Sequence, residues 1–279
     1  AWGDLDHVEK LTKNKADAHY NKAKLIFGIV TNDSTLQYKN WTIESAADYI
    51  KKAIAEEDTP TYRHLEGDIA FFNGDFENAY NSYMIVNQTA SSSASSWYLA
   101  AKSKEQIPGS NLMEIITMLD SAVAKSPANE AATYLLEGVD LKMQVGRYEE
   151  AVKDYDKYYM LTGGQVNDGF YYYREQAKFR ANDFDGALKD INTAITMHPE
   201  NAIYHAEKAS VYLRLKDLPQ AQASAEKAIE LQPEFASAYR ILGVCLIRLE
   251  KKTEACVHLN KAKELGDPVV EKLIKENCN

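Results

Sequence analysis

Three successive segments of the chain read DGFYYYREQAKFRANDFDGALKDINTAITMHPEN (168–201), AIYHAEKASVYLRLKDLPQAQASAEKAIELQPEF (202–235) and ASAYRILGVCLIRLEKKTEACVHLNKAKELGD (236–267). An offset of 34 residues aligns their small residues, which are Ala187, Ala221 and Ala255, then Ala194, Ala228 and Ala262. Pro199 and Pro233 keep the same spacing. A fixed period between about 20 and 50 residues indicates a solenoid of repeated units. This stretch therefore decides the fold.

One segment shows the physical basis of the period. Apolar and small residues recur at helical spacing over 203–215 and 218–231, and the polar pair Lys216-Asp217 separates the two runs. The recurrent alanines let two helices approach closely, because a methyl group leaves no gap at the crossing. A single hairpin of this kind cannot bury its apolar face alone, so it must stack on further copies.

The pattern resembles the tetratricopeptide repeat, a helix–turn–helix unit of the same length. The marks of that family in the last segment are Tyr239, Leu242, Gly243, Leu246, Ala255, Leu259 and Ala262. The aromatic position near the start of each segment, held by Tyr171, His205 and Tyr239, is expected to pack into the core. Glu175 departs from the pattern, since the family has a small residue there, and it makes a close helix crossing in that segment less expected.

The resemblance implies an all-α, right-handed superhelical solenoid of about seven antiparallel helix hairpins with a C-terminal capping helix. We expect one domain, 1–279, that begins with a leading segment, 1–14. The expected repeats are 15–60 (degenerate), 61–94, 95–128, 129–167, 168–201, 202–235 and 236–267, and the cap is 268–279.

Composition narrows the classes of function. The chain of 279 residues has a formal net charge of −9. Residues 1–140 hold 20 acidic and 12 basic residues, whereas 141–279 hold 21 and 20. Because nucleic-acid binding needs clustered basic residues, we do not expect a nucleic-acid partner. No run approaches the roughly 18 apolar residues of a membrane span.

The cysteines and the start of the chain leave questions open. Cys245, Cys256 and Cys278 form no CxxC pair. We expect small buried thiols, with Cys245 and Cys256 near each other across one hairpin. The chain starts Ala1-Trp2, so it is either a processed form or a piece of a longer protein. Abundant tyrosine and polar loops favour an exported bacterial protein, with a cytoplasmic location as the alternative.

Residues for catalysis are sparse. No HExxH, P-loop, GxGxxG or GxSxG string occurs, and no cofactor or metal is expected. His64, Glu66 and Asp68 form the one cluster that suggests acid–base chemistry, with His64 and Asp68 on one helix face. Such pairs are common on solvated helices, so we predict that the protein is not an enzyme.

The resemblance also implies a binding surface, because in this family the first helices of the repeats line a concave groove for peptides. The corresponding residues here are Tyr172, Gln176, Arg180, Ala206, Ser210, Arg214, Arg240, Val244 and Arg248, with His64, Asp68 and Phe72 as counterparts in the second repeat. Arg180, Arg214 and Arg248 lie one repeat apart, and a row of guanidinium groups suits an acidic segment. Some relatives clamp chaperone C-termini with Lys and Asn, but Tyr172, Gln176, Glu207 and Ile241 stand at the comparable positions.

These features predict a non-catalytic scaffold that binds a peptide segment of a partner protein in the groove, with self-association through terminal repeats also open. The alternative is a small-ligand or glycan-binding accessory protein of the bacterial cell envelope, using the tyrosine-rich face and the loop 163–167. A third hypothesis is an enzyme around His64. A long open groove in the structure would favour the scaffold. A pocket of drug-like size would favour the ligand-binding or glycan-binding protein. A buried carboxyl group with a strongly raised pKa would favour the enzyme.

Overall fold

The structure, a computed structural model, describes residues 14–32 and 41–278. These residues form α-helices and no β-strand, which confirms the all-α prediction. Of the predicted leading segment, 1–14, only Asn14 lies within the described residues. No helix in the described ranges combines the length and the apolar character needed to cross a membrane.

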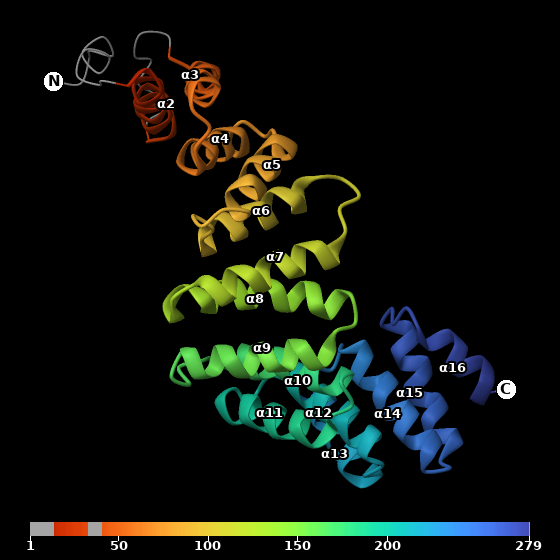
Figure 1. The fold of residues 1–279 in the computed structure, drawn as a ribbon. Helices are drawn as coiled ribbons and strands as arrows, with labels where there is room; N and C mark the ends of the chain where they lie inside the picture. Colours follow the sequence, from red (N-terminus) through yellow and green to blue (C-terminus); the bar gives the residue numbers. More distant parts are fainter. Residues whose placement is uncertain (1–13, 33–40, 279) are drawn as a thin grey trace. The chain divides into compact units, whose positions relative to one another are not determined.

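The first unit, residues 1–145, is a row of packed helices (Figure 1). Its helices are α2 (Lys15–Asn32), α3 (Ile43–Glu56), α4 (Pro60–Phe72), α5 (Phe76–Asn87), α6 (Ala94–Gln106), α7 (Leu112–Lys125) and α8 (Ala128–Gln144). Helices α2 and α3, α4 and α5, and α6 and α7 pack as hairpins, and each hairpin packs on the next helix in the chain.

The second unit, residues 146–279, repeats this arrangement. Its helices are α9 (Tyr148–Leu161), α10 (Asp168–Arg180), α11 (Phe184–Met197), α12 (Ala202–Leu215), α13 (Leu218–Leu231), α14 (Ala236–Arg248), α15 (Lys252–Glu264) and α16 (Val270–Asn277). The hairpins α10–α11, α12–α13 and α14–α15 stack in order, and α16 packs on α15 as the predicted cap.

The division between the units falls at Val145 and Gly146. This point lies in the turn of the predicted fourth repeat, whose two helices are α8 and α9. The single domain, the number of hairpins and the right-handed sense of the superhelix therefore stay predictions.

Local signals fix where the helices start and turn. Asp183 and Asp217 each cap the second helix of a repeat, their carboxylates accepting hydrogen bonds from the N–H groups of Gly186 and Gln220. The residue just before these caps is in the left-handed region, with φ of 64° at Asn182 and at Lys216. The tight turn between the two helices is therefore the same in these two repeats.

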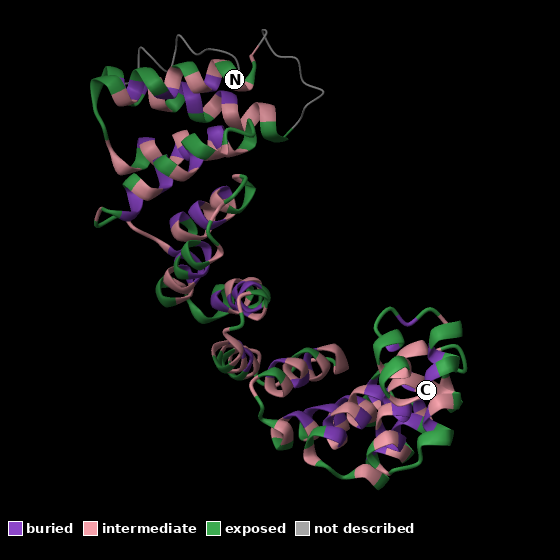
Figure 2. Cartoon of the chain, turned by 90° about the vertical axis from the view of Figure 1, so that its right-hand side faces the viewer, coloured by how far each residue is buried: buried purple, intermediate pink, exposed green. Residues whose placement is uncertain are grey.

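The recurrent alanines behave as the sequence predicts. All six, from Ala187 to Ala262, are fully buried. Figure 2 shows the buried residues gathered where neighbouring helices of each unit meet. The core is thus a series of helix crossings, each closed by small side chains.

One expectation about packing is refined and another is wrong. Tyr171 and Tyr239 pack against core clusters as expected, but the preceding Phe170 and, in the next repeat, Tyr204 are more deeply buried, at 6% and 5% exposed. Glu175 does not keep α10 and α11 apart: the two helices pack as a hairpin and Glu175 is buried between them and their neighbours.

The cysteines also differ from expectation. Cys256 and Cys278 form a disulfide, which ties α15 to the end of the capping helix, and Cys245 is a buried free thiol. The expectation of a small buried thiol is thus confirmed for Cys245 and wrong for Cys256 and Cys278. The pairing needs α16 to fold back on α15, a tertiary feature that residue spacing does not encode.

Candidate functional site

A pocket of about 450 Å³ lies in the second unit, on the first helices of two successive repeats. Three of the predicted groove residues line it: Gln176 and Arg180 from α10, and Arg214 from α12. The other lining residues are Tyr148, Glu175, Phe179, Asn182 and Glu207. The structure thus brings these three residues together at one pocket, and their role in binding stays a prediction.

A second pocket of about 410 Å³ follows along the same row of helices. Arg214 lines this pocket as well, together with Arg248, Lys216, Leu213 and Leu218. Because Arg214 lines both pockets, the arginines that recur in the sequence mark one connected surface. We call Arg180, Arg214 and Arg248 the arginine row.

The arginine row is exposed, and neighbouring groups hold each of its members. The Arg214 guanidinium lies 4.6 Å from the ring centroid of Phe184 and donates to Asn182 Oδ1 at 3.2 Å. Arg248 Nη1 donates to the Leu213 carbonyl at 2.6 Å. A guanidinium has five N–H donors and these contacts use few of them, so donors remain for a carboxylate. The contacts also fix the orientation of the side chains before a ligand arrives.

Five other predicted groove residues line neither pocket, and one of them, Ala206, is buried in the core. Tyr172 packs on Tyr204 with ring centroids 5.4 Å apart. The Ser210 hydroxyl donates to the carbonyl of Ala206 in its own helix, and Val244 packs against the core.

The fifth of these residues, Arg240, is engaged elsewhere. Its Nε donates to Asp267 Oδ2 at 2.8 Å, and the side chain of Asp267 is only 2% exposed. This ion pair joins α14 to the turn before the cap. Its buried carboxylate indicates a structural role, because removing one partner would leave an uncompensated charge.

Glu175 is the unexpected member of the first pocket. It is 1% exposed, and its Oε2 atom finds no hydrogen-bond partner among the residues that the structure describes. Burial raises the pKa of Glu175 to about 8, and the negative charges of Glu207 and Asp190 add to the shift. Burial also raises the pKa of Glu207, against the opposing effect of Arg240 and Arg180. The pocket therefore contains a carboxyl group that lacks a neutralising partner.

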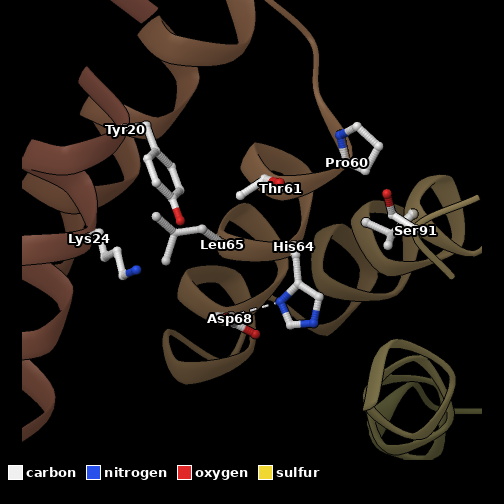
Figure 3. A pocket seen from close by; sticks show the side chains of 9 residues that line it. Tyr20, Lys24, Pro60, Thr61, His64, Leu65, Asp68 and Ser91 are labelled. Carbon is white, nitrogen blue, oxygen red and sulfur yellow. Dashed lines mark hydrogen bonds and ion pairs between the residues drawn. The ribbon is translucent and has the colours of Figure 1, made fainter. Parts of the chain in front are cut away.

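In the first unit the predicted counterparts also line pockets. His64 and Asp68 lie in a pocket of about 350 Å³ with Tyr20 and Lys24 (Figure 3). His64 Nδ1 is 3.3 Å from Asp68 Oδ2, and this hydrogen bond raises the pKa of His64 against the effect of burial. Asp68 and Phe72 also line an apolar pocket of about 620 Å³, which Phe27, Phe71 and Phe76 complete.

Comparison with known families identifies the repeats. The family model described as Tetratricopeptide repeat matches residues 176–221 and 207–267, which include the three residues of the arginine row. Residues 176–267 therefore consist of tetratricopeptide repeats.

Relatives share the repeats over part of their length. A protein described as "Protein SGT1 homolog" from Oryza sativa subsp. japonica is 33% identical over 105 residues, which is 37% of this chain and 29% of the relative. Human "Serine/threonine-protein phosphatase 5" is 36% identical over 61 residues, or 22% and 12%. The chain thus spans less than a third of the length of these relatives.

A solved structure shares the fold. "MamA 41-end from Desulfovibrio magneticus RS-1" superposes with a TM-score of 0.53 at 19% identity, covering 62% of this chain and 94% of that one. This likeness supports the helical solenoid of the tetratricopeptide repeat family.

Within the family pattern, Glu175 could have been found from its position. The equivalent positions of the other repeats hold small residues, namely Gly67, Ala101, Gly138, Ala209 and Gly243. A glutamate at that position must either open the helix crossing or send its carboxyl group elsewhere. The sequence showed the departure, but only the structure shows that the side chain lines a pocket.

In the cluster around His64, both carboxylates already accept hydrogen bonds from neighbouring side chains. Glu66 Oε2 accepts hydrogen bonds from Arg63 at 3.0 Å and from Ser82 at 2.8 Å, so its carboxylate is engaged. Asp68 accepts a hydrogen bond from Tyr83 at 2.8 Å in addition to its contact with His64. The carboxyl group with a strongly raised pKa is Glu175, in the other unit, and no histidine, cysteine or serine lines its pocket.

Proposed function

We propose that the protein is an interaction scaffold that binds an acidic, extended segment of a partner protein along the arginine row. The supporting observation is that two successive pockets share Arg214 and are bounded by Arg180 and Arg248 at either end. Guanidinium groups at repeat spacing present parallel donors, and carboxylates accept these bidentately. An extended segment can follow such a row from one repeat to the next.

Relatives provide a precedent for interaction with other proteins. A relative named "Hsp70-Hsp90 organizing protein" from Triticum aestivum is 34% identical over 65 residues, 23% of this chain and 11% of the relative. The name of this relative states that it organises two other proteins, Hsp70 and Hsp90. The positions of the Lys and Asn clamp hold other residues here, so the proposed partner is recognised by a different set of side chains.

The glycan-binding alternative has weaker support. Its tyrosine-rich face is largely used in packing, since Tyr171 and Tyr172 pack against the core and Tyr173 is the exposed member of the run. The arginine row offers charge-assisted hydrogen bonds, which are stronger with a carboxylate than with a neutral sugar.

A peptide-display selection tests the proposal. A random 12-residue peptide library would be selected on the immobilised protein, and the enriched peptides would be measured by fluorescence anisotropy. We expect enrichment in Asp and Glu, and binding at least about 10-fold weaker for a variant with Arg180→Glu, Arg214→Glu and Arg248→Glu, since each lost charge-assisted hydrogen bond contributes about 1.5–3 kcal/mol.

A matched variant controls for net charge. Lys153, Lys189 and Lys252 are exposed on second helices, so Lys153→Glu, Lys189→Glu and Lys252→Glu make the same change in charge away from the pockets. This control should bind the peptides as the wild type does, and circular dichroism would confirm that both variants fold. Equal weakening in both variants, or enrichment without acidic residues, would contradict the proposal.

A further inference from the structure

Glu175 lies at the one repeat position where packing most restricts size. The equivalent Ala209 is fully buried at its own helix crossing. Glu175 is equally enclosed, yet its side chain extends from the crossing to the wall of the pocket. A buried polar group without a partner in a native structure calls for an explanation. Departures from local rules of this kind tend to mark functional sites.

The surrounding charges do not neutralise Glu175. The groups that act on it from the neighbouring helices are two carboxyl groups, Asp190 on α11 and Glu207 on α12, and both raise its pKa. Asp190 is already paired, with Arg174 at 2.6 Å and Lys178 at 2.8 Å.

Two guanidinium groups, one on α10 and one on α14, act on Glu207 rather than on Glu175. Arg180 and Arg240 both lower the pKa of Glu207, whereas neither is among the charges that shift Glu175. Arg214, which also lines the pocket, donates to Asn182 and is likewise not among the charges that shift the pKa of Glu175. Glu175 is left without a cation, at the wall of a space open to a ligand.

We propose that this pocket receives one basic side chain, a lysine ammonium or an arginine guanidinium, from the segment bound along the arginine row. Glu175 is its buried carboxylate and Glu207 is the second carboxylate of the site. The inference rests on the proposed function and adds a specificity element to it. The preferred segment is acidic with one basic residue, which enters a pocket of a size suited to a small group.

A positive charge supplied by the ligand would explain why two carboxyl groups, Glu175 and Glu207, lie at one pocket. A cation between Glu175 and Glu207 converts a repulsive pair into a bridged one, in a region of low dielectric where the attraction is strong. A neutral Glu175 could instead donate a hydrogen bond to a carbonyl group of the ligand. The two mechanisms differ in the sign of their pH dependence, because the first uses the ionised form and the second the protonated form.

The first experiment repeats the display selection with Glu175→Gln, which keeps the shape and removes the charge. On the wild type we expect enriched peptides to hold Lys or Arg at one fixed position among acidic residues, and this preference should disappear on the variant. Acidic peptides without a fixed basic position would overturn the inference and leave the proposed function standing. No enriched peptide at all would overturn both.

Two control variants keep this result interpretable. Glu175→Ala introduces the residue found at the equivalent Ala209, so it is compatible with the fold and should lose the basic preference as well. Glu234→Gln removes an exposed carboxylate with the same change in charge and should keep the preference. Loss of the preference in Glu234→Gln would also overturn the inference.

The second experiment measures the affinity of one selected lysine-containing peptide from pH 6.5 to pH 8.5. With the pKa of Glu175 at about 8, its ionised fraction rises about 25-fold across this range, so the affinity for the cation should rise by up to that factor. Glu175→Gln should show little of this dependence. An affinity that falls with rising pH would assign Glu175 as a hydrogen-bond donor and overturn the cation site.

Discussion

Replacing Glu175 by glutamine should change how the stability of the protein depends on pH. In the unfolded chain the pKa of this carboxyl group is near its ordinary value of 4.5, and in the folded protein it is about 8. Between these values the unfolded state loses the proton while the folded state keeps it. The contribution of Glu175 is therefore fully present below pH 4.5 and is lost as the pH rises through 8.

The magnitude follows from the difference between the two pKa values. Each pH unit within the window costs about 1.36 kcal/mol, so the wild type should lose about 3 kcal/mol of unfolding free energy between pH 5 and pH 7.5 relative to Glu175→Gln. The amide of the variant is also buried without a partner, but that penalty does not depend on pH. The comparison of slopes therefore isolates the carboxyl group.

Urea unfolding followed by far-ultraviolet circular dichroism at several pH values measures this difference. The three tryptophans, Trp2, Trp41 and Trp97, all lie in the first unit, so tryptophan fluorescence follows that unit separately. Glu175→Ala should lose the pH dependence in the same way as Glu175→Gln. Parallel stability curves for wild type and Glu175→Gln would refute the argument, since they would show that Glu175 has an ordinary pKa in the folded state.

Two further predictions concern packing and covalent structure. Gly67→Ala should destabilise the first unit by about 1–3 kcal/mol, because a Cβ atom would lie 2.7 Å from a buried tyrosine ring. Gly28→Ala, in a helix with open space around that glycine, should instead raise the stability of the first unit by up to about 1 kcal/mol. Equal shifts of the melting temperature for the two variants would contradict this expectation. Reduction of Cys256–Cys278 should lower the stability of the last hairpin and its cap by about 3 kcal/mol, the entropy of closing a loop of sequence separation 22. Hydrogen exchange of α15 and α16 with and without dithiothreitol measures this loss, and unchanged protection would argue against the bond.

The sequence by itself determined the repeating architecture of 168–267. Recurrent small residues specify close helix crossings, and polar pairs such as Lys216-Asp217 specify the turns, so both are local properties that the period displays. The same period placed Arg180, Arg214 and Arg248 in register, because equivalent positions of stacked repeats face the same way. This register is the part of the candidate site that the sequence predicted.

The tertiary structure decided how individual side chains are used. Arg240 stands in the predicted groove set, yet it pairs with Asp267, 27 residues away, across a turn whose path no local pattern specifies. The bond between Cys256 and Cys278 has the same origin. Glu175 appeared in the sequence only as an exception to the repeat. Its burial, its missing partner and its place in the pocket depend on three helices at once, so only the folded chain could show them.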